Sequence, residues 1–292
     1  MSSSRLIIGC GYLGRRVANG WLAEGDRVYA LTRSPERAAD LRQAGLIPIV
    51  GDVTNPATLP AFPEADTLLY AVGLDRRSGQ TQREVYVGGL ANVLPRIAGR
   101  VRWAIYISST SVYGQNAGEW VDESSECRPE ADNGQVCLEA ERLFQKAIPT
   151  SNILRLAGIY GPDRLVARVE SLKAGIVPDG NPEAWLNLIH VDDAVAAVLA
   201  CEQHAVPGAT YLVSDNKPCS RREYYTLLAK LIGAPDPFPP LARGGARGMA
   251  TASSDVTHRN KRCHNRRLEE ELQVNLRFPN IQTGLPDALA QR

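Results

Sequence analysis

Short apolar runs alternate along the chain with stretches in which apolar residues recur every three or four positions. This alternation predicts buried strands separated by helices, because consecutive parallel strands need a crossover between them. The strands are expected at residues 6–8, 28–31, 46–50, 67–72, 101–108, 153–156 and 210–213. The pattern therefore predicts an α/β fold with a doubly wound parallel sheet and helices on both faces.

The helices are expected after the first strand up to residue 24, and at residues 35–44, 82–97, 134–147, 192–201 and 221–232. Ser34 followed by a proline predicts an N-cap and a first helical residue. Ser220 and Glu223 form a capping-box pattern. Asp192 is expected to be the N-cap of the helix that follows it. Residues 233–249, rich in proline and glycine, are expected to form a loop.

A glycine motif follows the first strand. Gly9, Gly11 and Gly14, with Tyr12 and Leu13 between the last two, form Gly-x-Gly-x-x-Gly at the junction of a strand and a helix. In that context the glycines provide a tight turn, a close approach to a pyrophosphate, and close packing of helix on strand. The pyrophosphate then lies at the positive end of the helix dipole. The sequence therefore predicts a dinucleotide site.

The end of the second strand indicates which dinucleotide is bound. An NAD site usually has an acidic residue there, whereas an NADP site has arginine for the 2′-phosphate. The sequence has Thr32 at the acidic position, followed by Arg33 and by Ser34, which can add a hydrogen bond. NADP is therefore the favoured cofactor. NAD remains the alternative, since Arg33 can also be a solvated surface residue.

The next two strands end in further cofactor candidates. Asp52 and Val53 follow the third strand, where a carboxylate can accept a hydrogen bond from an adenine amino group. Asp52 can equally be a turn residue without a ligand. The fourth strand ends in candidates expected to line the same site: Ala71, Val72 and Gly73.

Composition and charge exclude several classes of function. The 292 residues include 33 Lys+Arg and 32 Asp+Glu, a net charge of +1, which argues against wholesale binding to nucleic acid or to an anionic membrane. No apolar run reaches the roughly 20 residues of a membrane helix. The six cysteines form no Cys-x-x-Cys pair, so no metal site is expected. Together with the absence of a signal-peptide pattern, these features predict a cytoplasmic protein.

Residues 243–267 contain seven Lys+Arg and one acidic residue, Asp255. As a nucleic-acid site this segment lacks interleaved aromatic residues, and the acidic run 269–271 follows it directly. We therefore expect a solvated surface or the rim of a pocket for an anionic substrate.

Four further motifs follow the glycine loop along the chain. They are Ser-Ser-Thr-Ser-Val-Tyr-Gly at 108–114, Asp-Glu at 122–123, Leu-Arg-Leu-Ala-Gly-Ile-Tyr-Gly-Pro at 154–162, and Ile-His-Val-Asp-Asp-Ala at 189–194. With them the chain resembles the extended short-chain dehydrogenases/reductases, in particular the NAD-dependent epimerase/dehydratase family. The resemblance implies a Rossmann domain at 1–157, completed by 186–215. A small C-terminal substrate-binding lobe would comprise 216–292 with 158–185.

The same resemblance implies a catalytic serine and a Tyr-x-x-x-Lys pair. Ser109 matches the serine position. The pair aligns with Asn133 and Cys137, and no tyrosine in the chain is followed four positions later by lysine. Asparagine cannot accept a proton in this range, and cysteine cannot supply the fixed charge of lysine. We expect Tyr113, at the mouth of the cleft, as the substitute acid or base; packing beneath a loop is its alternative role.

The substrate is expected at the carboxyl edge of the sheet, facing the lobe. Candidate residues there are Arg164, Trp185, Asn187 and Arg262. His190 is expected to pack or to hydrogen-bond rather than to catalyse.

Two functions follow from these features. The first is an NAD(P)-dependent oxidoreductase with an altered proton relay, acting on a sugar-nucleotide-like or other small anionic substrate. The second is a catalytically silent NADP(H)-sensing protein. The resemblance also makes a homodimer a candidate assembly.

Overall fold

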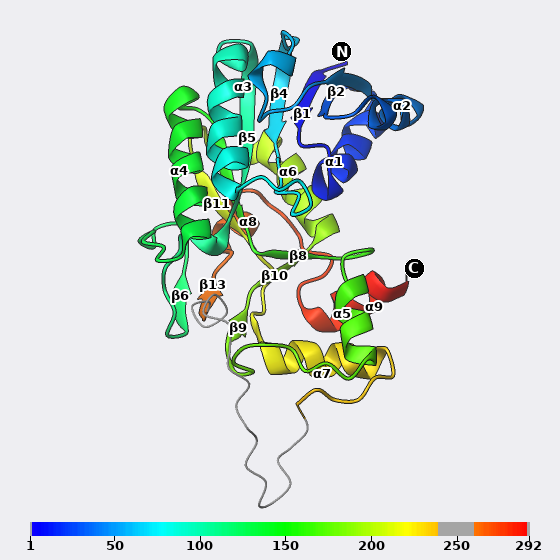
Figure 1. The fold of residues 1–292 in the computed structure, drawn as a ribbon. Helices are drawn as coiled ribbons and strands as arrows, with labels where there is room; N and C mark the ends of the chain where they lie inside the picture. The colour runs from blue at the N-terminus through cyan, green and yellow to red at the C-terminus, as the bar shows by residue number, and fades with distance from the viewer. Residues whose placement is uncertain (1, 239–259, 291–292) are drawn as a thin grey trace, which may run out of the picture.

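A seven-stranded parallel sheet forms the centre of the computed structural model, which describes residues 2–238 and 260–290 (Figure 1). Its order is β11-β7-β5-β4-β1-β2-β3, so the chain starts in the middle and winds outward in both directions. The strands are β1 (Ser4–Ile8), β2 (Arg27–Thr32), β3 (Ile47–Val50), β4 (Ala65–Tyr70), β5 (Val101–Ser109), β7 (Asn152–Leu156) and β11 (Thr210–Val213). All seven predicted strands are confirmed.

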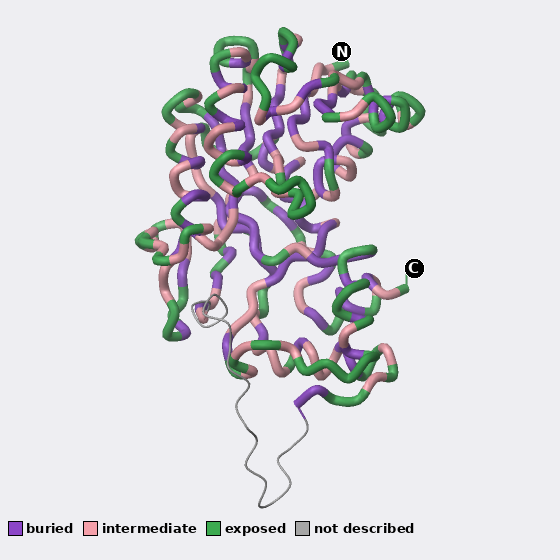
Figure 2. Tube along the Cα trace, in the orientation of Figure 1, coloured by how far each residue is buried: buried purple, intermediate pink, exposed green. Residues whose placement is uncertain are grey.

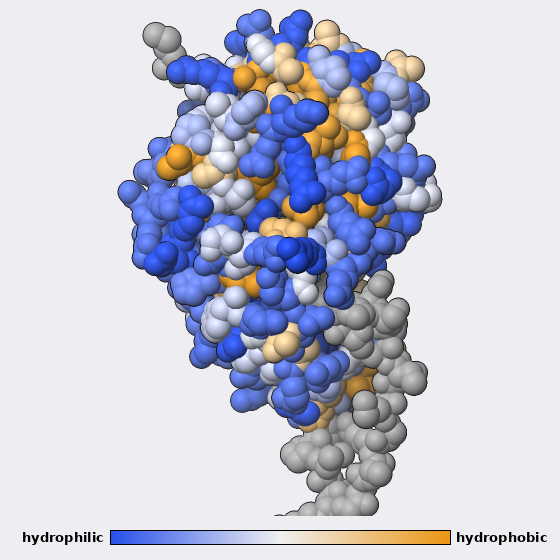
Figure 3. Space-filling view, turned by 90° about the vertical axis from the view of Figure 1, so that its left-hand side faces the viewer, coloured by the Kyte–Doolittle hydropathy of each residue, from blue (hydrophilic) through white to orange (hydrophobic). Residues whose placement is uncertain are grey.

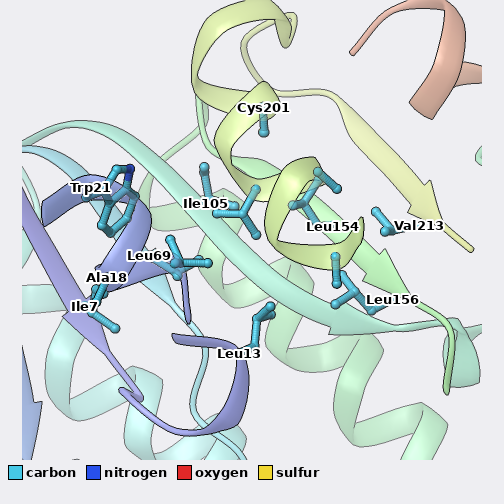
Figure 4. Close-up of a cluster of buried hydrophobic side chains, with 14 of the residues drawn as sticks. Ile7, Leu13, Ala18, Trp21, Leu69, Ile105, Leu154, Leu156, Cys201 and Val213 are labelled. Atoms are coloured by element: carbon cyan, nitrogen blue, oxygen red, sulfur yellow. The ribbon is translucent and has the colours of Figure 1, made fainter. Parts of the chain in front are cut away.

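Helices cover both faces of this sheet, as predicted. One face carries α1 (Tyr12–Ala23), α2 (Pro35–Gln43) and α6 (Val191–His204), and the other carries α3 (Gly89–Ile97) and α4 (Asp132–Ala147). Successive strand residues point to opposite faces, so Ile7 packs under α1 while Leu6 and Ile8 pack on the α3 side. Figure 4 shows the first of these clusters, with Trp21 and Leu13 of α1 lying over Leu69 and Ile105.

Burial follows this layering, with the strands largely purple in Figure 2 and the outer helix surfaces exposed. The inner strands are largely apolar because both of their faces are covered, whereas the edge strand β3 has no fully buried residue. This explains why the strands could be read from the sequence.

Local signals were confirmed at two helix starts and were wrong at a third. Ser34 accepts a hydrogen bond from the backbone N–H of Arg37, and Ser220 closes a capping box with Glu223 at the start of α7 (Arg221–Leu231). The predicted N-cap Asp192 is wrong. Helix α6 begins one residue earlier, and buried His190 is its N-cap, because its Nδ1 accepts the N–H of Asp192.

The helix predicted at 82–97 has two parts. A π-helical turn, Glu84–Gly88, precedes α3. Short 3₁₀ turns lie at Pro56–Thr58 and Thr110–Val112. π-Helical turns are rare and recur at functional sites, so the turn Glu84–Gly88 is a candidate for a functional role.

Three pairs of short strands, none predicted, lie below the carboxyl edge of the sheet in Figure 1. They are β8 (Gly158–Tyr160) with β10 (Leu188–His190), β9 (Trp185–Leu186) with β12 (Cys219–Ser220), and β6 (Glu119–Val121) with β13 (Lys261–Cys263). Beside them, α5 (Val166–Lys173), α7 and α9 (Ile281–Ala290) enclose a separate apolar cluster around Tyr160 and Tyr224. The short helix α8 (Arg266–Glu270) lies against β11.

Figure 3 shows the side of the molecule on which α3 and α4 lie. Apolar residues gather in the upper half of this face, and hydrophilic residues cover most of the rest. No helix among residues 2–238 and 260–290 combines the length and the apolarity that crossing a membrane requires. Most of the basic segment 243–267, and most of the loop predicted at 233–249, lie outside the described residues.

Candidate functional site

A cleft of about 690 Å³ lies at the carboxyl edge of the sheet, where the ends of β1, β2, β4 and β5 meet. This is the edge at which parallel α/β sheets bind ligands. Every residue predicted for the cofactor lines it: Gly9, Gly11, Tyr12, Leu13, Gly14, Thr32, Arg33, Ser34, Asp52, Val53, Ala71, Val72 and Gly73. Ser109 and Arg164 line it too. Motifs spread over more than 150 residues therefore meet around one space.

The three glycines shape the floor of the cleft. Gly9 has φ +99°, and a Cβ on it would lie 2.4 Å from the carbonyl carbon of Ala71. A Cβ on Gly14 would lie 2.5 Å from the carbonyl oxygen of Gly9, whereas one on Gly11 would meet no other described atom within 4 Å. Gly9 and Gly14 thus permit close packing, and Gly11 leaves space above the N-terminus of α1. This cradle fits a pyrophosphate.

Two arginines project toward the end of the cleft beside β2. The Arg33 guanidinium donates to Asp75 Oδ2 at 3.0 Å, and both side chains remain about half exposed. Arg37, in the first turn of α2, donates to the carbonyl of Cys10 in the glycine loop at 3.0 Å. The backbone N–H of Arg77 and the bond from Arg33 hold the pKa of Asp75 below its usual range. Sequence reasoning missed Arg37 and Asp75.

The predicted adenine-side residues have partners within the protein. Asp52 Oδ1 accepts bonds from the backbone N–H and the hydroxyl of Thr54, both at 2.8 Å, which is the turn role open to it. Val53 packs under Gly89 of α3. Thr32 is buried, and its hydroxyl has no hydrogen-bond partner in the part of the chain that the structure describes.

The other end of the cleft collects residues from β5, α4 and the π-helical turn. Ser109 Oγ accepts the N–H of Ser111 at 3.1 Å. Asn133 and Cys137, one turn apart on α4, line the cleft together with Tyr86. Tyr86 was not predicted, since nothing in its local sequence marks it as functional.

A buried ion pair lies directly behind this end of the cleft. Ser108 Oγ donates to Glu141 Oε1 at 2.5 Å, and Arg155 donates to both carboxylate oxygens of Glu141, with a shortest distance of 2.8 Å. Glu141 is on α4, Ser108 on β5 and Arg155 on β7. The pair therefore fixes the helix that carries Asn133 and Cys137 against the sheet.

The expected place of Tyr113 at the cleft mouth is wrong. Its side chain is 2% exposed, does not line the cleft, and packs with Val121 and Cys263 in a separate apolar cluster. Its hydroxyl accepts from Arg155 at 3.1 Å, and burial raises the pKa of the phenol well above its ordinary value. The reason is the 3₁₀ turn after Ser109, which carries Tyr113 beneath the loop.

The four predicted substrate residues do not meet in one place. Arg164 lines the cleft, with its guanidinium carbon 4.5 Å from the ring centroid of Tyr12. The other three lie by β9 and β13: the Arg262 guanidinium carbon is 5.2 Å from the Trp185 ring, and Asn187 Oδ1 accepts the N–H of Cys263 at 2.6 Å. Asn187 also donates to the carbonyl of residue 261, so its amide holds β13 in place.

Comparisons with known proteins match this architecture. Protein YeeZ of Escherichia coli (strain K12) is 31% identical over 244 residues, which cover 79% of this chain and 84% of YeeZ. The structure of a functionally unknown conserved protein from Silicibacter pomeroyi DSS superposes with a TM-score of 0.80 at 29% identity, covering 99% of both chains. MoeE5, solved in complex with UDP-glucose and NAD, has the same fold, with a TM-score of 0.78 at 20% identity over 99% of this chain and 98% of its own.

The family model described as "NAD dependent epimerase/dehydratase family" matches residues 6–214, from β1 through β11. These residues include the glycine loop, Ser109 and every predicted cofactor residue. On this match the chain belongs to the NAD-dependent epimerase/dehydratase family.

Proposed function

We propose that the chain is an NADP-dependent oxidoreductase that acts on a sugar-nucleotide-like or other small anionic substrate, with a proton relay different from the family's Tyr-x-x-x-Lys. The observation that carries the proposal is the single cleft that runs from the glycine loop to Ser109 and α4. Such a cleft can hold an extended dinucleotide with its reactive end beside Ser109.

Within this cleft Gly9, Gly11 and Gly14 would hold the pyrophosphate, and Asp52 the adenine. A bound nicotinamide would supply hydride transfer. Arg33, Arg37 and Ser34 gather at the β2 end, which supports recognition of a 2′-phosphate and therefore NADP over NAD. MoeE5, which shares only the fold, is described with NAD and UDP-glucose.

The substrate would enter from the lobe formed by 216–292 with 158–185. Three cations, at separate places around the cleft and the lobe, support an anionic substrate. Arg164 lines the cleft, and Arg262 lies between the rings of Trp120 and Trp185 with its guanidinium carbon 4.9 and 5.2 Å from the two centroids. The third, Arg168, is stacked near Tyr224. Ser109 would hydrogen-bond the reacting substrate oxygen.

Calorimetry with NADPH and NADH tests cofactor binding. We expect both to bind, NADPH more tightly; failure of both to bind would refute the proposal. Stopped-flow absorbance of the reduced nicotinamide, over a panel of sugar nucleotides, then tests turnover. A substrate-dependent change that is lost in Ser109→Ala supports an oxidoreductase.

A second candidate function is a catalytically silent NADP(H)-sensing protein. It is favoured by Asn133 and Cys137, which stand in the cleft where the family resemblance places tyrosine and lysine. This candidate predicts tight binding of NADPH with no hydride exchange for any sugar nucleotide of the panel. Hydride exchange with one of them would exclude it.

We further propose a homodimer formed through the apolar upper part of the α3 and α4 face (Figure 3). Sedimentation equilibrium gives the mass directly. Replacing Ala91, which is exposed on α3, by glutamate would dissociate the dimer. A monomer in the unmodified protein would refute this assembly.

A further inference from the structure

Tyr86 places a phenol inside the cleft, from a helix other than α4. It lies in the π-helical turn Glu84–Gly88 and lines the cleft together with Asn133, Cys137 and Ser109. We propose that Tyr86 is the residue that exchanges a proton with the substrate in the reaction proposed above, on which this inference rests.

The hydroxyl of Tyr86 can still donate its proton. Its oxygen accepts the backbone N–H of Leu74 at 3.3 Å, and no residue that the structure describes accepts its proton. The other two tyrosines that line the cleft are engaged in contacts within the protein. The Tyr12 hydroxyl donates to the carbonyl of Pro162 at 2.7 Å, and Tyr106 is 4% exposed and stacks on Tyr70.

Packing holds the ring of Tyr86 beside the first turns of α4. Tyr86 packs on the apolar cluster that contains Cys137. Gln82, one turn earlier, donates to the carbonyl of Asn133 at 3.3 Å and to Cys137 Sγ at 3.5 Å. The turn that carries the phenol is therefore tied to the helix on which the family's proton donor would lie.

The proposed step balances in both directions. In reduction, the substrate carbonyl carbon gains a hydride from reduced nicotinamide and its C=O π pair moves to oxygen. That oxygen takes the proton of Tyr86, whose O–H electron pair stays on the phenolate. In oxidation, the substrate O–H proton passes to the Tyr86 phenolate while the C–H hydrogen leaves as hydride to oxidised nicotinamide. Proton exchange of this kind needs a positioned group within hydrogen-bond reach.

Few charges surround this phenol. Burial raises the pKa of Tyr86 and the N–H of Leu74 lowers it, and the titratable groups that interact with the phenol are Cys137 on α4 and Tyr106 on β5. Arg83 and Glu84 are on its own turn, but Arg83 pairs with Glu139 at the surface and Glu84 accepts from Thr81. A positive charge arriving in the cleft would therefore have a large effect on the ionisation of Tyr86.

The test uses this coupling and needs no known substrate. The near-ultraviolet absorbance of tyrosinate is titrated against pH with NADP⁺ bound and with NADPH bound. We expect one tyrosine to ionise at least about one pH unit lower with NADP⁺, because its nicotinamide is positively charged. Tyr86→Phe should abolish that difference. Tyr29→Phe, a half-buried tyrosine on β2 that does not line the cleft, should retain it.

The outcomes separate the two proposals. If neither cofactor binds, the proposed function is wrong and this inference falls with it. If both bind and the difference is absent, or persists in Tyr86→Phe, only this inference is wrong. Persistence in Tyr86→Phe with loss in Tyr113→Phe would assign the role to Tyr113. For any sugar nucleotide turned over, Tyr86→Phe should lower kcat at least about 100-fold with unchanged affinity for NADPH.

Discussion

Arg33→Ala should lower the affinity for a 2′-phosphate and leave the affinity for the rest of the cofactor unchanged. Arg33 lines the cleft next to the N-cap of α2, and its partner Asp75 lines it from the loop that follows β4. A bound 2′-phosphate would therefore compete with a carboxylate that already holds the guanidinium.

The structure sets the size of this effect. A hydrogen bond to a charged group contributes about 1.5–3 kcal/mol. The exposed Arg33–Asp75 pair is screened by water and contributes little, and that small contribution is lost when the phosphate displaces Asp75. The net loss in Arg33→Ala is therefore about 0.5–3 kcal/mol, or about 2- to 150-fold in affinity. Asp75→Asn removes the competitor, so it should raise the affinity for the 2′-phosphate by about threefold, as expected for a like charge at about 6 Å in water.

Two fragments of the cofactor isolate this contribution. Calorimetry with adenosine 2′,5′-bisphosphate and with adenosine 5′-monophosphate compares ligands that differ only in the 2′-phosphate. Arg42→Ala is the matched control, because Arg42 is exposed at the end of α2 and does not line the cleft. Equal loss for both fragments in Arg33→Ala, or no loss for either, would falsify the assignment of Arg33 to the 2′-phosphate.

Three further predictions concern other parts of the structure. Glu141→Gln leaves buried Arg155 without its carboxylate, so the free energy of unfolding in urea should fall by about 3–5 kcal/mol; a loss below about 1 kcal/mol would contradict a buried pair. Gly9 has φ +99°, and the Cβ of an alanine there would lie 2.4 Å from the backbone of Ala71. Gly9→Ala should therefore lower both the Tm and the affinity for NADPH. A variant that retains both would show that the turn can relax. Burial raises the pKa of Asp215 to about 8, above its value of about 3.9 in an unfolded chain, so the folded state binds the extra proton. The stability that this proton contributes is complete below about pH 4 and is lost as the pH rises toward about 8; urea unfolding against pH should show this fall, and Asp215→Asn should lack it.

The sequence predicted the sheet well because most of its strands are buried on both faces, the edge strand β3 being the exception. Each of the seven is a short apolar run between turn residues, so its own residues are sufficient to identify it. The strands β9 and β12 have two residues each and pair across more than 30 positions. Helix α9 contains Gly284 and Pro286, which argue against a helix when read locally. Tertiary packing, which no local pattern reports, stabilises these elements.

The residues of the candidate site divide in the same way, into those that a local pattern identifies and those that only the fold brings together. The residues predicted for the cofactor line one cleft, because turn chemistry and helix caps place them locally, from the glycine loop to Ser34. Arg37 and Asp75 were missed because they reach the cleft from a helix turn and a loop without a motif. Trp185, Asn187 and Arg262 were expected beside Arg164, but Asn187 binds the backbone of β13.

The two tyrosines show why distance along the chain is a poor guide to a proton donor. Tyr113 is four residues from Ser109, yet the turn between them buries it and Arg155 occupies its hydroxyl. Tyr86 is 23 residues away on another element, yet both line the same cleft. A proton can be exchanged only by a hydroxyl that reaches the reacting oxygen, so exposure to the cleft decides between them. The absence of tyrosine at position 133 therefore does not remove a phenol from the cleft, and the response of Tyr86 to the charge of the bound nicotinamide tests whether this phenol can exchange the proton.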